Sequence, residues 1–365
     1  MTIAEAEPAP TACVSALLDN PLIYVTGKGG AGKTTVAAAL GLASAARGHR
    51  AIVCDLAGSD QLARAFGRPA GRSGELRLKG RLSSLSLDPQ EALEEWLRRQ
   101  PGGAAAVAVL TRSQAFAHFV AAAPGAKELV TVGKVVDLAR REAPLAYDVV
   151  TADGPSTGHA LGMLAAPRTV GEVARIGAVG AQARELRDFL ADPAGPGYVG
   201  VTLPEEMAVQ EVLELERELP AAVGRELDLI VANAVYPDRF SDEEAERLRA
   251  FAGRFPVVRV ALAHHRHARA QAEHLRSLRE QAHAPVVALP YLFVPPIGLP
   301  EYEALARALS RRRPVGSRPA GGSWLSARRA GRRGLRRPSP ARRPRGRGRR
   351  RRAGRCRRGP PSRST

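Results

Sequence analysis

Nine consecutive residues near the start of the chain combine glycines, lysines and threonines in the way that phosphate-binding loops do. They are Gly27, Lys28, Gly29, Gly30, Ala31, Gly32, Lys33, Thr34 and Thr35. A backbone with few side chains can curl its N–H groups around an anion, and a following helix adds the positive end of its dipole. In such a loop Lys33 reaches the β- and γ-phosphates, and the Thr34 hydroxyl holds Mg²⁺. These residues therefore predict a site for a nucleotide and Mg²⁺.

The segments on both sides of this loop are those that such a site needs. The apolar run 22–25 predicts a strand, and the small residues of 36–47 predict a helix. Strand, glycine loop and helix form the setting in which a G-x-x-x-x-G-K-S/T motif binds phosphate. The alternative is a glycine-rich turn that carries a lysine by chance.

A second lysine, Lys28, follows the first glycine and gives the pattern G-K-G-G-x-G-K-T-T. This pattern resembles the loop of the arsenite-pump and tail-anchored-protein-targeting ATPases, and more distantly that of the division-site and chromosome-partition ATPases. The resemblance, which covers about residues 21–310, implies that the substrate is ATP. It also implies that Lys28 reaches the phosphates of a facing subunit, so we expect a homodimer or a pair with a paralogous ATPase subunit. A solvated loop lysine is the alternative.

Two aspartates follow segments that read as buried parallel strands. Asp55 follows 51–54, and Asp153 follows 146–152. The stretch Asp153-Gly-Pro-Ser-Thr-Gly-His resembles the second switch of the family, D-x-x-P-T-G-H, with serine in place of its proline. A carboxylate at a strand end opposite a phosphate loop is placed to bind Mg²⁺ through water, so Asp153 is the expected metal residue.

The first switch departs from the family pattern. Ungapped alignment from the loop places Ala57 where the family has the aspartate of its D-P-A motif. Because strand side chains alternate with period 2, Asp55 and Ala57 point to the same face, and Asp55 is assigned to the metal's water shell and to catalysis. Asp60 is a less favoured substitute. The efficiency of hydrolysis is left open by this replacement.

Two residues in the second half of the chain correspond to adenine-contacting positions of the family. Asn233 closes the expected strand 227–232, and Pro290 lies in a proline-rich loop after the expected strand 286–289. An amide carries both a donor and an acceptor, which suits the edge of a base.

The remaining pattern predicts an α/β fold with a doubly wound, mostly parallel sheet, because strands alternate with helices of ten or more residues. A lead-in is expected over 1–20, an ATPase domain over 21–310, and a helical insertion at about 88–142. A further strand is expected at 256–261. Five histidines nearby are read as surface residues of an exposed helix because they lack adjacent carboxylates or cysteines at ligand spacing: His264, His265, His267, His274 and His283.

The charge of the chain is concentrated at its end. Residues 311–365 carry 22 Arg and no Lys, Asp or Glu, so the net charge of +19 leaves −3 for the first 310 residues. This segment has almost no apolar residues and is predicted to be disordered. Such a tail would bind nucleic acid or anionic membrane without specificity. The same residue mix also arises from out-of-frame or read-through translation of a GC-rich gene, and no motif decides between the two.

Three well-separated cysteines with no C-x-x-C pair argue against a disulfide framework and fit a reducing compartment. With no leader sequence in view, we expect a cytoplasmic protein, with peripheral membrane contact as an option.

The function expected is an ATPase that couples hydrolysis to the handling of an unidentified protein client or membrane partner. The alternatives are a nucleotide-gated switch that hydrolyses slowly or not at all, and a nucleic-acid binder led by its tail.

Overall fold

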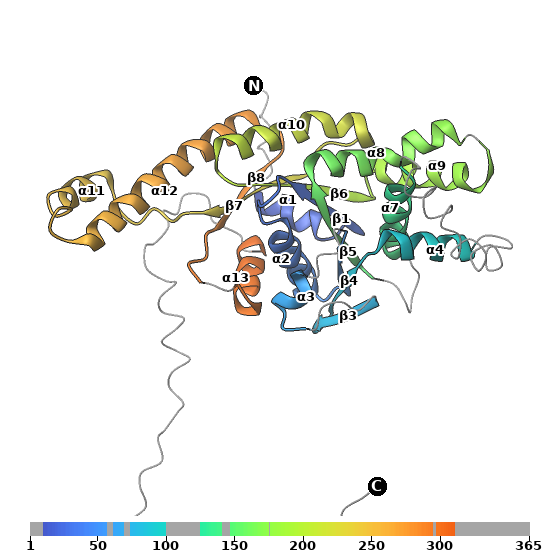
Figure 1. The fold of residues 1–365 in the computed structure, drawn as a ribbon, viewed down its shortest axis with the longest axis horizontal. Helices are drawn as coiled ribbons and strands as arrows, with labels where there is room; N and C mark the ends of the chain where they lie inside the picture. Colours follow the sequence, from blue (N-terminus) through green and yellow to red (C-terminus); the bar gives the residue numbers. More distant parts are fainter. Residues whose placement is uncertain are drawn as a thin grey trace, which may run out of the picture. The chain divides into compact units, whose positions relative to one another are not determined.

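A computed structural model describes residues 10–56, 61–68, 74–99, 125–140, 147–174, 176–294 and 297–310. Within these ranges the strands form one sheet in the order β3-β4-β2-β5-β1-β6-β7-β8 (Figure 1). Neighbouring strands are parallel except β3 and β4. The doubly wound, mostly parallel sheet expected from the sequence is therefore confirmed. The strands are β1 Leu22–Gly27, β2 Ala51–Asp55, β3 Gly74–Lys79, β4 Leu82–Ser86, β5 Val149–Ser156, β6 Pro196–Thr202, β7 Leu229–Val235 and β8 Val286–Pro290.

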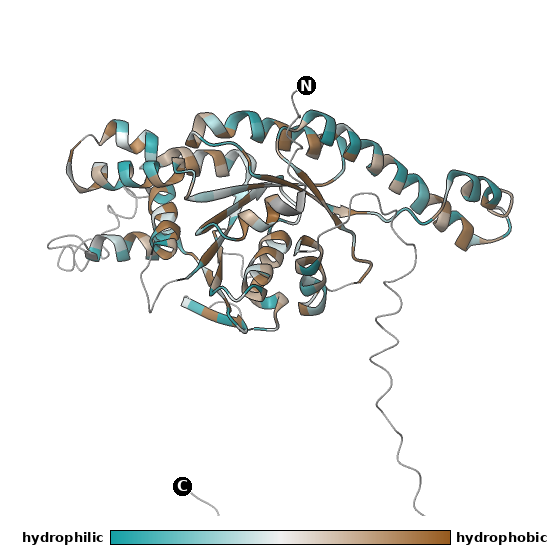
Figure 2. Ribbon diagram, turned by 180° about the vertical axis from the view of Figure 1, so that it is seen from behind, coloured by the Kyte–Doolittle hydropathy of each residue, from teal (hydrophilic) through white to brown (hydrophobic). Residues whose placement is uncertain are grey.

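Helices cover both faces of the sheet. Helices α1, α2, α3 and α13 pack on one face, and α7, α8, α9, α10 and α12 pack on the other. Figure 2 shows the strands as the more hydrophobic part between them. The helices are α1 Pro10–Leu17, α2 Lys33–Ala46, α3 Gln61–Ala65, α4 Pro89–Arg99, α7 Ala126–Ala139, α8 Thr157–Val173, α9 Gly177–Ala191, α10 Glu206–Val223, α11 Asp242–Arg249, α12 Pro256–Gln281 and α13 Leu299–Ser310.

The central strand β1 is buried along its whole length because both of its faces are covered. Its side chains alternate between the two cores: Ile23 and Val25 contact the α2 side, whereas Leu22 and Tyr24 contact the α8 and α10 side. A strand of this kind reads as a continuous apolar run rather than an alternating one. This is why residues 22–25 are recognisable from the sequence.

The expected strand at 256–261 is wrong, because these residues form the start of α12. Pro256 occupies the first turn of the helix, where its missing N–H costs no hydrogen bond. The buried residues along α12 recur at helical spacing, and Val258 and Leu262 begin that series. The exposed Val257 and Val260 fill the gaps and produce the apolar run that resembles a strand.

One of the five histidines also departs from expectation. His265 on α12 is buried, and its Nε2 lies 3.2 Å from Asp242 Oδ1 at the start of α11. No group of three or more His, Cys, Asp or Glu residues that could hold a metal ion occurs in the described ranges. Ser241 and Glu244 form a capping box at the start of α11.

Part of the helical insertion is described. Helices α4 and α7 pack together through Leu93 and Val130, whereas residues 101–124 and 141–146 lie outside the described residues. The tail 311–365 also lies outside them, so its expected disorder stays a prediction. The domain boundaries likewise stay predictions.

Among the described helices, none combines the length and the apolar character needed to cross a membrane.

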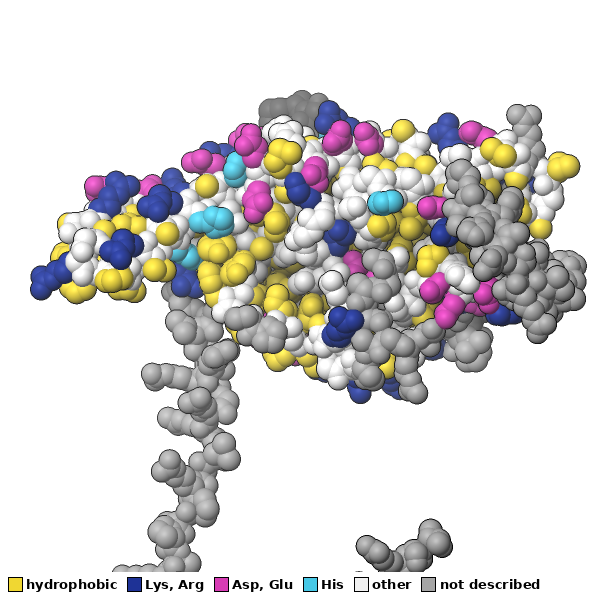
Figure 3. All heavy atoms as spheres, viewed as in Figure 1, with side chains coloured by type: hydrophobic (Ala, Val, Ile, Leu, Met, Phe, Trp, Pro, Cys, Tyr) yellow, Lys and Arg dark blue, Asp and Glu magenta, His cyan; other side chains and the backbone are white. Residues whose placement is uncertain are grey.

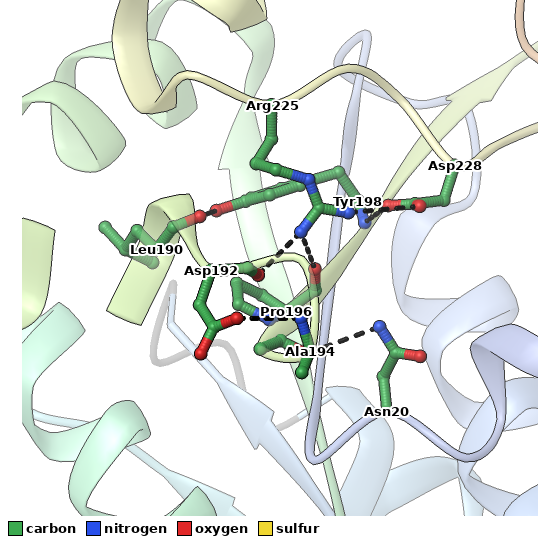
Figure 4. A network of polar contacts seen from close by, with 9 residues as sticks. Asn20, Leu190, Asp192, Ala194, Pro196, Tyr198, Arg225 and Asp228 are labelled. Carbon is green, nitrogen blue, oxygen red and sulfur yellow. Dashed lines mark hydrogen bonds and ion pairs between the residues drawn. The ribbon is translucent and has the colours of Figure 1, made fainter. Parts of the chain in front are cut away.

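A polar network fixes the amino ends of β6 and β7 (Figure 4). The Arg225 guanidinium donates to the Asp192 carbonyl at 2.7 Å and lies 3.4 Å from Asp228 Oδ1. Asp228 accepts from the Tyr198 backbone N–H at 2.8 Å, and the Tyr198 hydroxyl donates to the Leu190 carbonyl at 2.8 Å. Burial raises the pKa of Asp228, and the bond from Tyr198 and the charge of Arg225 oppose that rise. The network therefore holds the two strands whose opposite ends face the glycine loop.

Candidate functional site

The glycine loop connects the end of β1 to the start of α2, as the sequence predicts. Two of its glycines have positive φ and no room for a side chain. A Cβ on Gly27, at φ +148°, would lie 2.0 Å from the Val201 carbonyl oxygen of β6. A Cβ on Gly32, at φ +86°, would lie 2.3 Å from Nδ2 of Asn233. The loop therefore depends on glycine both for its conformation and for its close approach to β6 and β7.

Lys33, the first residue of α2, folds back over the loop. Its Nζ donates to the Lys28 carbonyl oxygen at 3.1 Å. Burial lowers the pKa of Lys33, and the nearby charge of Asp153 opposes this shift. The amine therefore lies in a partly desolvated position, where the negative charge of a phosphate would be a favourable partner.

Two aspartates lie side by side next to the loop. Asp55 at the end of β2 and Asp153 in β5 are register partners in the parallel sheet, and both are buried. The Thr34 hydroxyl donates to Asp153 Oδ2 at 2.6 Å. The structure thus brings together Thr34, Asp55 and Asp153, the three residues that the sequence assigns to the metal.

The environment of Asp153 favours its neutral form. Burial raises the pKa of its carboxyl to about 6, and the Asp55 charge adds to the rise. The hydrogen bond from Thr34 and the charge of Lys33 act in the opposite direction and lower this pKa. A cation bound beside this carboxyl would lower its pKa again, because an opposite charge favours the ionised form.

The donor atoms present fit Mg²⁺. Asp153 Oδ1 is buried and has no hydrogen-bond partner among the described residues, and the same holds for the hydroxyl of Thr157 at the start of α8. Carboxylate and hydroxyl oxygens are hard ligands, and Mg²⁺ in nucleotide sites takes one or two protein groups and completes its shell with phosphate and water.

Asn233 and Pro290 lie at the carboxyl ends of neighbouring strands. Asn233 in β7 donates its Nδ2–H to the Ala31 carbonyl of the loop at 2.9 Å, a contact that the sequence reasoning missed. Pro290 ends β8 and pairs in register with Val235. Ala234, which follows Asn233 in β7, has φ 57°, a backbone conformation that side-chain-bearing residues rarely adopt. The two positions therefore share one edge with the loop.

The side chain of Lys28 is engaged within its own chain. Its Nζ lies 2.8 Å from Glu211 Oε1 on α10, and the two side chains are 32% and 36% exposed. No local pattern in the sequence points to this pair, because 183 positions separate the two residues. Ala57 and Asp60 lie outside the described residues, and His159 is exposed in the first turn of α8.

This arrangement defines a class of protein. A buried parallel strand leads into a glycine loop with lysine and threonine at the start of a helix. Asp153 lies in the adjacent strand β5, and Asp55 ends β2 on the other side of β5. This is the fold of a P-loop nucleoside triphosphatase.

Comparison with known proteins narrows the class to a family. The profile of the anion-transporting ATPase family matches residues 21–179. ATPase BagA of Mycobacterium tuberculosis is 30% identical over 232 residues, which are 61% of this chain and 67% of that protein. The chain belongs to the anion-transporting ATPase family, and the resemblance read from its loop is confirmed.

Two further relatives carry names from both branches of the resemblance. A Halobacterium salinarum protein named for arsenical pump-driving ATPases is 25% identical over 300 residues, which are 76% of this chain and 42% of that protein. ATPase GET3 of Pyricularia oryzae is 28% identical over 208 residues, which are 55% of this chain and 59% of that protein. The chain is therefore similar to relatives with both kinds of name, and the similarity does not assign it to either branch.

Proposed function

We propose that this protein binds Mg-ATP in the glycine loop and hydrolyses it by attack of water on the γ-phosphoryl group. The observation that carries the proposal is the 2.6 Å hydrogen bond between Thr34 and Asp153, which joins the loop to a buried carboxyl. Lys33 lies beside the same carboxyl, so cation, hydroxyl and carboxylate converge on one point. Phosphoryl transfer needs little from a protein beyond positioning and charge neutralisation, and this point can supply both.

Each part of ATP has a place in this proposal. The backbone N–H groups of residues 27–35 hold the phosphates, and Lys33 neutralises the β- and γ-oxygens. Thr34 and Asp153 would hold Mg²⁺, which would supply further charge neutralisation for the phosphates. Asn233 uses its amide N–H on the loop, so its Oδ1 is left for the amino group of adenine, and Pro290 borders the base.

The proposed quaternary structure rests on Lys28. We propose a nucleotide-dependent homodimer, or a pair with a paralogous ATPase subunit, in which Lys28 reaches the nucleotide of the facing subunit. Hydrolysis then drives the handling of a client that is a protein or a membrane partner. The partial exposure of Lys28 supports this role, because the side chain is accessible from outside its own chain.

A slow or non-hydrolysing nucleotide switch is the second candidate, and Ala57 is the observation that favours it. Single-turnover hydrolysis measured beside ATP affinity separates the two. Tight binding with measurable hydrolysis supports the ATPase, whereas tight binding with negligible hydrolysis supports the switch.

Asp55 is expected to take over part of the role that Ala57 cannot perform. Asp55→Asn should lower the single-turnover rate about 10²-fold without weakening ATP binding, because orienting the attacking water lowers the barrier selectively. Ala57→Asp should then add little. The opposite pattern, in which Asp55→Asn is silent and Ala57→Asp accelerates hydrolysis, would assign the missing function to position 57 alone.

Lys28→Ala should leave ATP affinity within a modest factor and weaken ATP-dependent dimerisation and hydrolysis together. Glu211→Gln should instead strengthen ATP-dependent dimerisation, because it releases Lys28 from its ion pair. An exposed pair of this kind contributes about 0.2–1 kcal/mol, so dimerisation should tighten by up to about fivefold. Light scattering with a non-hydrolysable ATP analogue measures both variants. Lys79→Ala, which breaks the surface pair with Glu303, is the matched control. Normal dimerisation of Lys28→Ala would show that Lys28 acts only as a loop residue.

A further inference from the structure

The turn after α11 and the start of α12 expose four large apolar side chains. We call residues 247–260 the hairpin tip. Of these side chains Val257 is 72% exposed, Val260 68%, Phe251 52% and Phe255 44%. Figure 1 shows α11 and the start of α12 at the end of the molecule that lies away from the sheet. Large apolar side chains that gather on one protruding surface indicate a contact with something outside the chain.

The hairpin tip does not need these four residues for its own packing. Helices α11 and α12 are joined by a separate small core of Ala245, Val258 and Leu262, with Leu248 and Ala252 packed against it. Val258 points into that core, whereas its neighbour Val257 points away from it. The exposed surface is therefore an outer face of a hairpin that is already packed on its inner side.

The hairpin tip also carries only positive charge. It has four arginines and no Asp or Glu: Arg247, Arg249, Arg254 and Arg259. Arg249 pairs with Glu246, whereas the Arg254 guanidinium lies 5.4 Å from the centre of the Phe255 ring and Arg259 donates to the Ala252 carbonyl at 3.3 Å. Neither Arg254 nor Arg259 has a carboxylate partner within the described ranges. Figure 3 shows hydrophobic and arginine or lysine side chains intermixed over this end of the molecule.

We propose that the hairpin tip binds the surface of a bilayer that contains anionic phospholipids. Phe251, Phe255, Val257 and Val260 enter the boundary between headgroups and acyl chains, and the arginines bind the phosphate groups around them. Apolar side chains surrounded by cations are the composition of segments that lie in this boundary. Arginine suits the phosphate because its planar guanidinium donates two hydrogen bonds at once.

Other occupants fit these residues less well. A second copy of the hairpin tip in a two-fold contact would bring four arginines of each chain against the same four of the other. A nucleic acid would satisfy the arginines and stack on Phe251 and Phe255, but it would leave Val257 and Val260 without apolar contact. A bilayer satisfies the charges and the apolar side chains together.

The experiment must separate the hairpin tip from the tail, because the 22 arginines of 311–365 are expected to bring the whole chain to an anionic surface. The depth to which the hairpin tip inserts into the bilayer distinguishes its binding from that of the tail, and the fluorescence of a tryptophan placed in the tip measures this depth. Trp324 in the tail is replaced by phenylalanine in every variant, because this tryptophan would itself respond to the vesicles. The full-length Phe251→Trp variant is then mixed with vesicles of phosphatidylcholine and phosphatidylglycerol with brominated acyl chains. Its added fluorescence should shift to the blue and be quenched. Ile176→Trp, which replaces a residue that is 89% exposed between α8 and α9, is the matched control and should show neither change.

Second-site variants identify the residues responsible. In the Phe251→Trp background, Val257→Asp with Val260→Asp should abolish quenching. Arg254→Gln with Arg259→Gln should reduce it, because each charge removed lowers partitioning to an anionic surface about fivefold. Both double variants change exposed side chains and should melt as the parent does. Quenching that persists in both would overturn the proposal, as would an unchanged Phe251→Trp spectrum in protein that sediments with the vesicles. A blue shift caused by protein concentration alone, or by an oligonucleotide without vesicles, would assign the hairpin tip to a second copy or to nucleic acid.

Discussion

Replacing Lys33 by alanine is expected to lower kcat/KM for ATP hydrolysis by about 10³- to 10⁵-fold, the range that a cation on the transferring phosphoryl group supplies. The loop offers no substitute close by. Its other lysine, Lys28, is held by Glu211 at 2.8 Å and points to a different partner. Loss of Lys33 should therefore remove both ground-state affinity for the phosphates and stabilisation of the transition state.

The fold should survive this change. Burial lowers the pKa of Lys33, which means that the folded protein disfavours the charged amine, so its removal does not weaken the core. Thermal melting without nucleotide should match that of wild type, and Lys127→Ala on the exposed side of α7 should leave both melting and hydrolysis unchanged. Unchanged ATP affinity and rate in a folded Lys33→Ala protein would refute the site.

The glycine loop could be read from the sequence because the information is local. Strand, loop and helix are consecutive, and the positive φ of Gly27 and Gly32 is a property of the positions themselves. The aspartates were found in the same way, from the ends of two buried strands. What the sequence did not show is that Asp55 and Asp153 are register partners, since that depends on the order β2-β5-β1.

Non-local contacts account for most of what was missed. The ion pair of Lys28 with Glu211 and the hydrogen bond of Asn233 to Ala31 each join segments about two hundred residues apart. Helices α8 and α9 also received no assignment, although both cover the sheet. Periodicity describes one face of one segment and contains no information on which distant segment will cover it.

The error at 256–261 has a different cause. Val257 and Val260 are exposed, and they interrupt the helical pattern with apolar residues that a solvated helix face does not need. If every apolar side chain is assumed to be buried, residues 256–261 resemble a strand. The same two residues carry the proposed lipid contact, so sequence reasoning failed where the chain departs from simple burial.

Asp153→Asn is expected to stabilise the nucleotide-free protein at neutral pH. An ordinary aspartate loses its proton near 3.8, whereas burial raises the pKa of Asp153 to about 6. Between these values the folded protein binds more protons than the unfolded chain, so the free energy of unfolding falls as pH rises from about 4 to about 6. A shift of about two units corresponds to about 3 kcal/mol at most. Asparagine cannot ionise, so the variant should be more stable than wild type at about pH 8 and nearly equal to it at about pH 4.

The same substitution should lower hydrolysis about 10³-fold, because it removes a carboxylate proposed for Mg²⁺, whose charge neutralisation lowers the barrier by several kcal/mol. Mg-ATP stabilises the folded state by an amount that grows with the logarithm of its affinity, so it should raise the melting temperature of wild type more than that of Asp153→Asn. Urea unfolding at the two pH values, melting with and without Mg-ATP, and single-turnover rates measure these effects, with Asp238→Asn on the exposed segment after β7 as the control. A gain in stability with unchanged hydrolysis would leave Asp153 as a buried acid without a metal role. A loss of stability at about pH 8 would instead show that its charge is already compensated in the nucleotide-free protein.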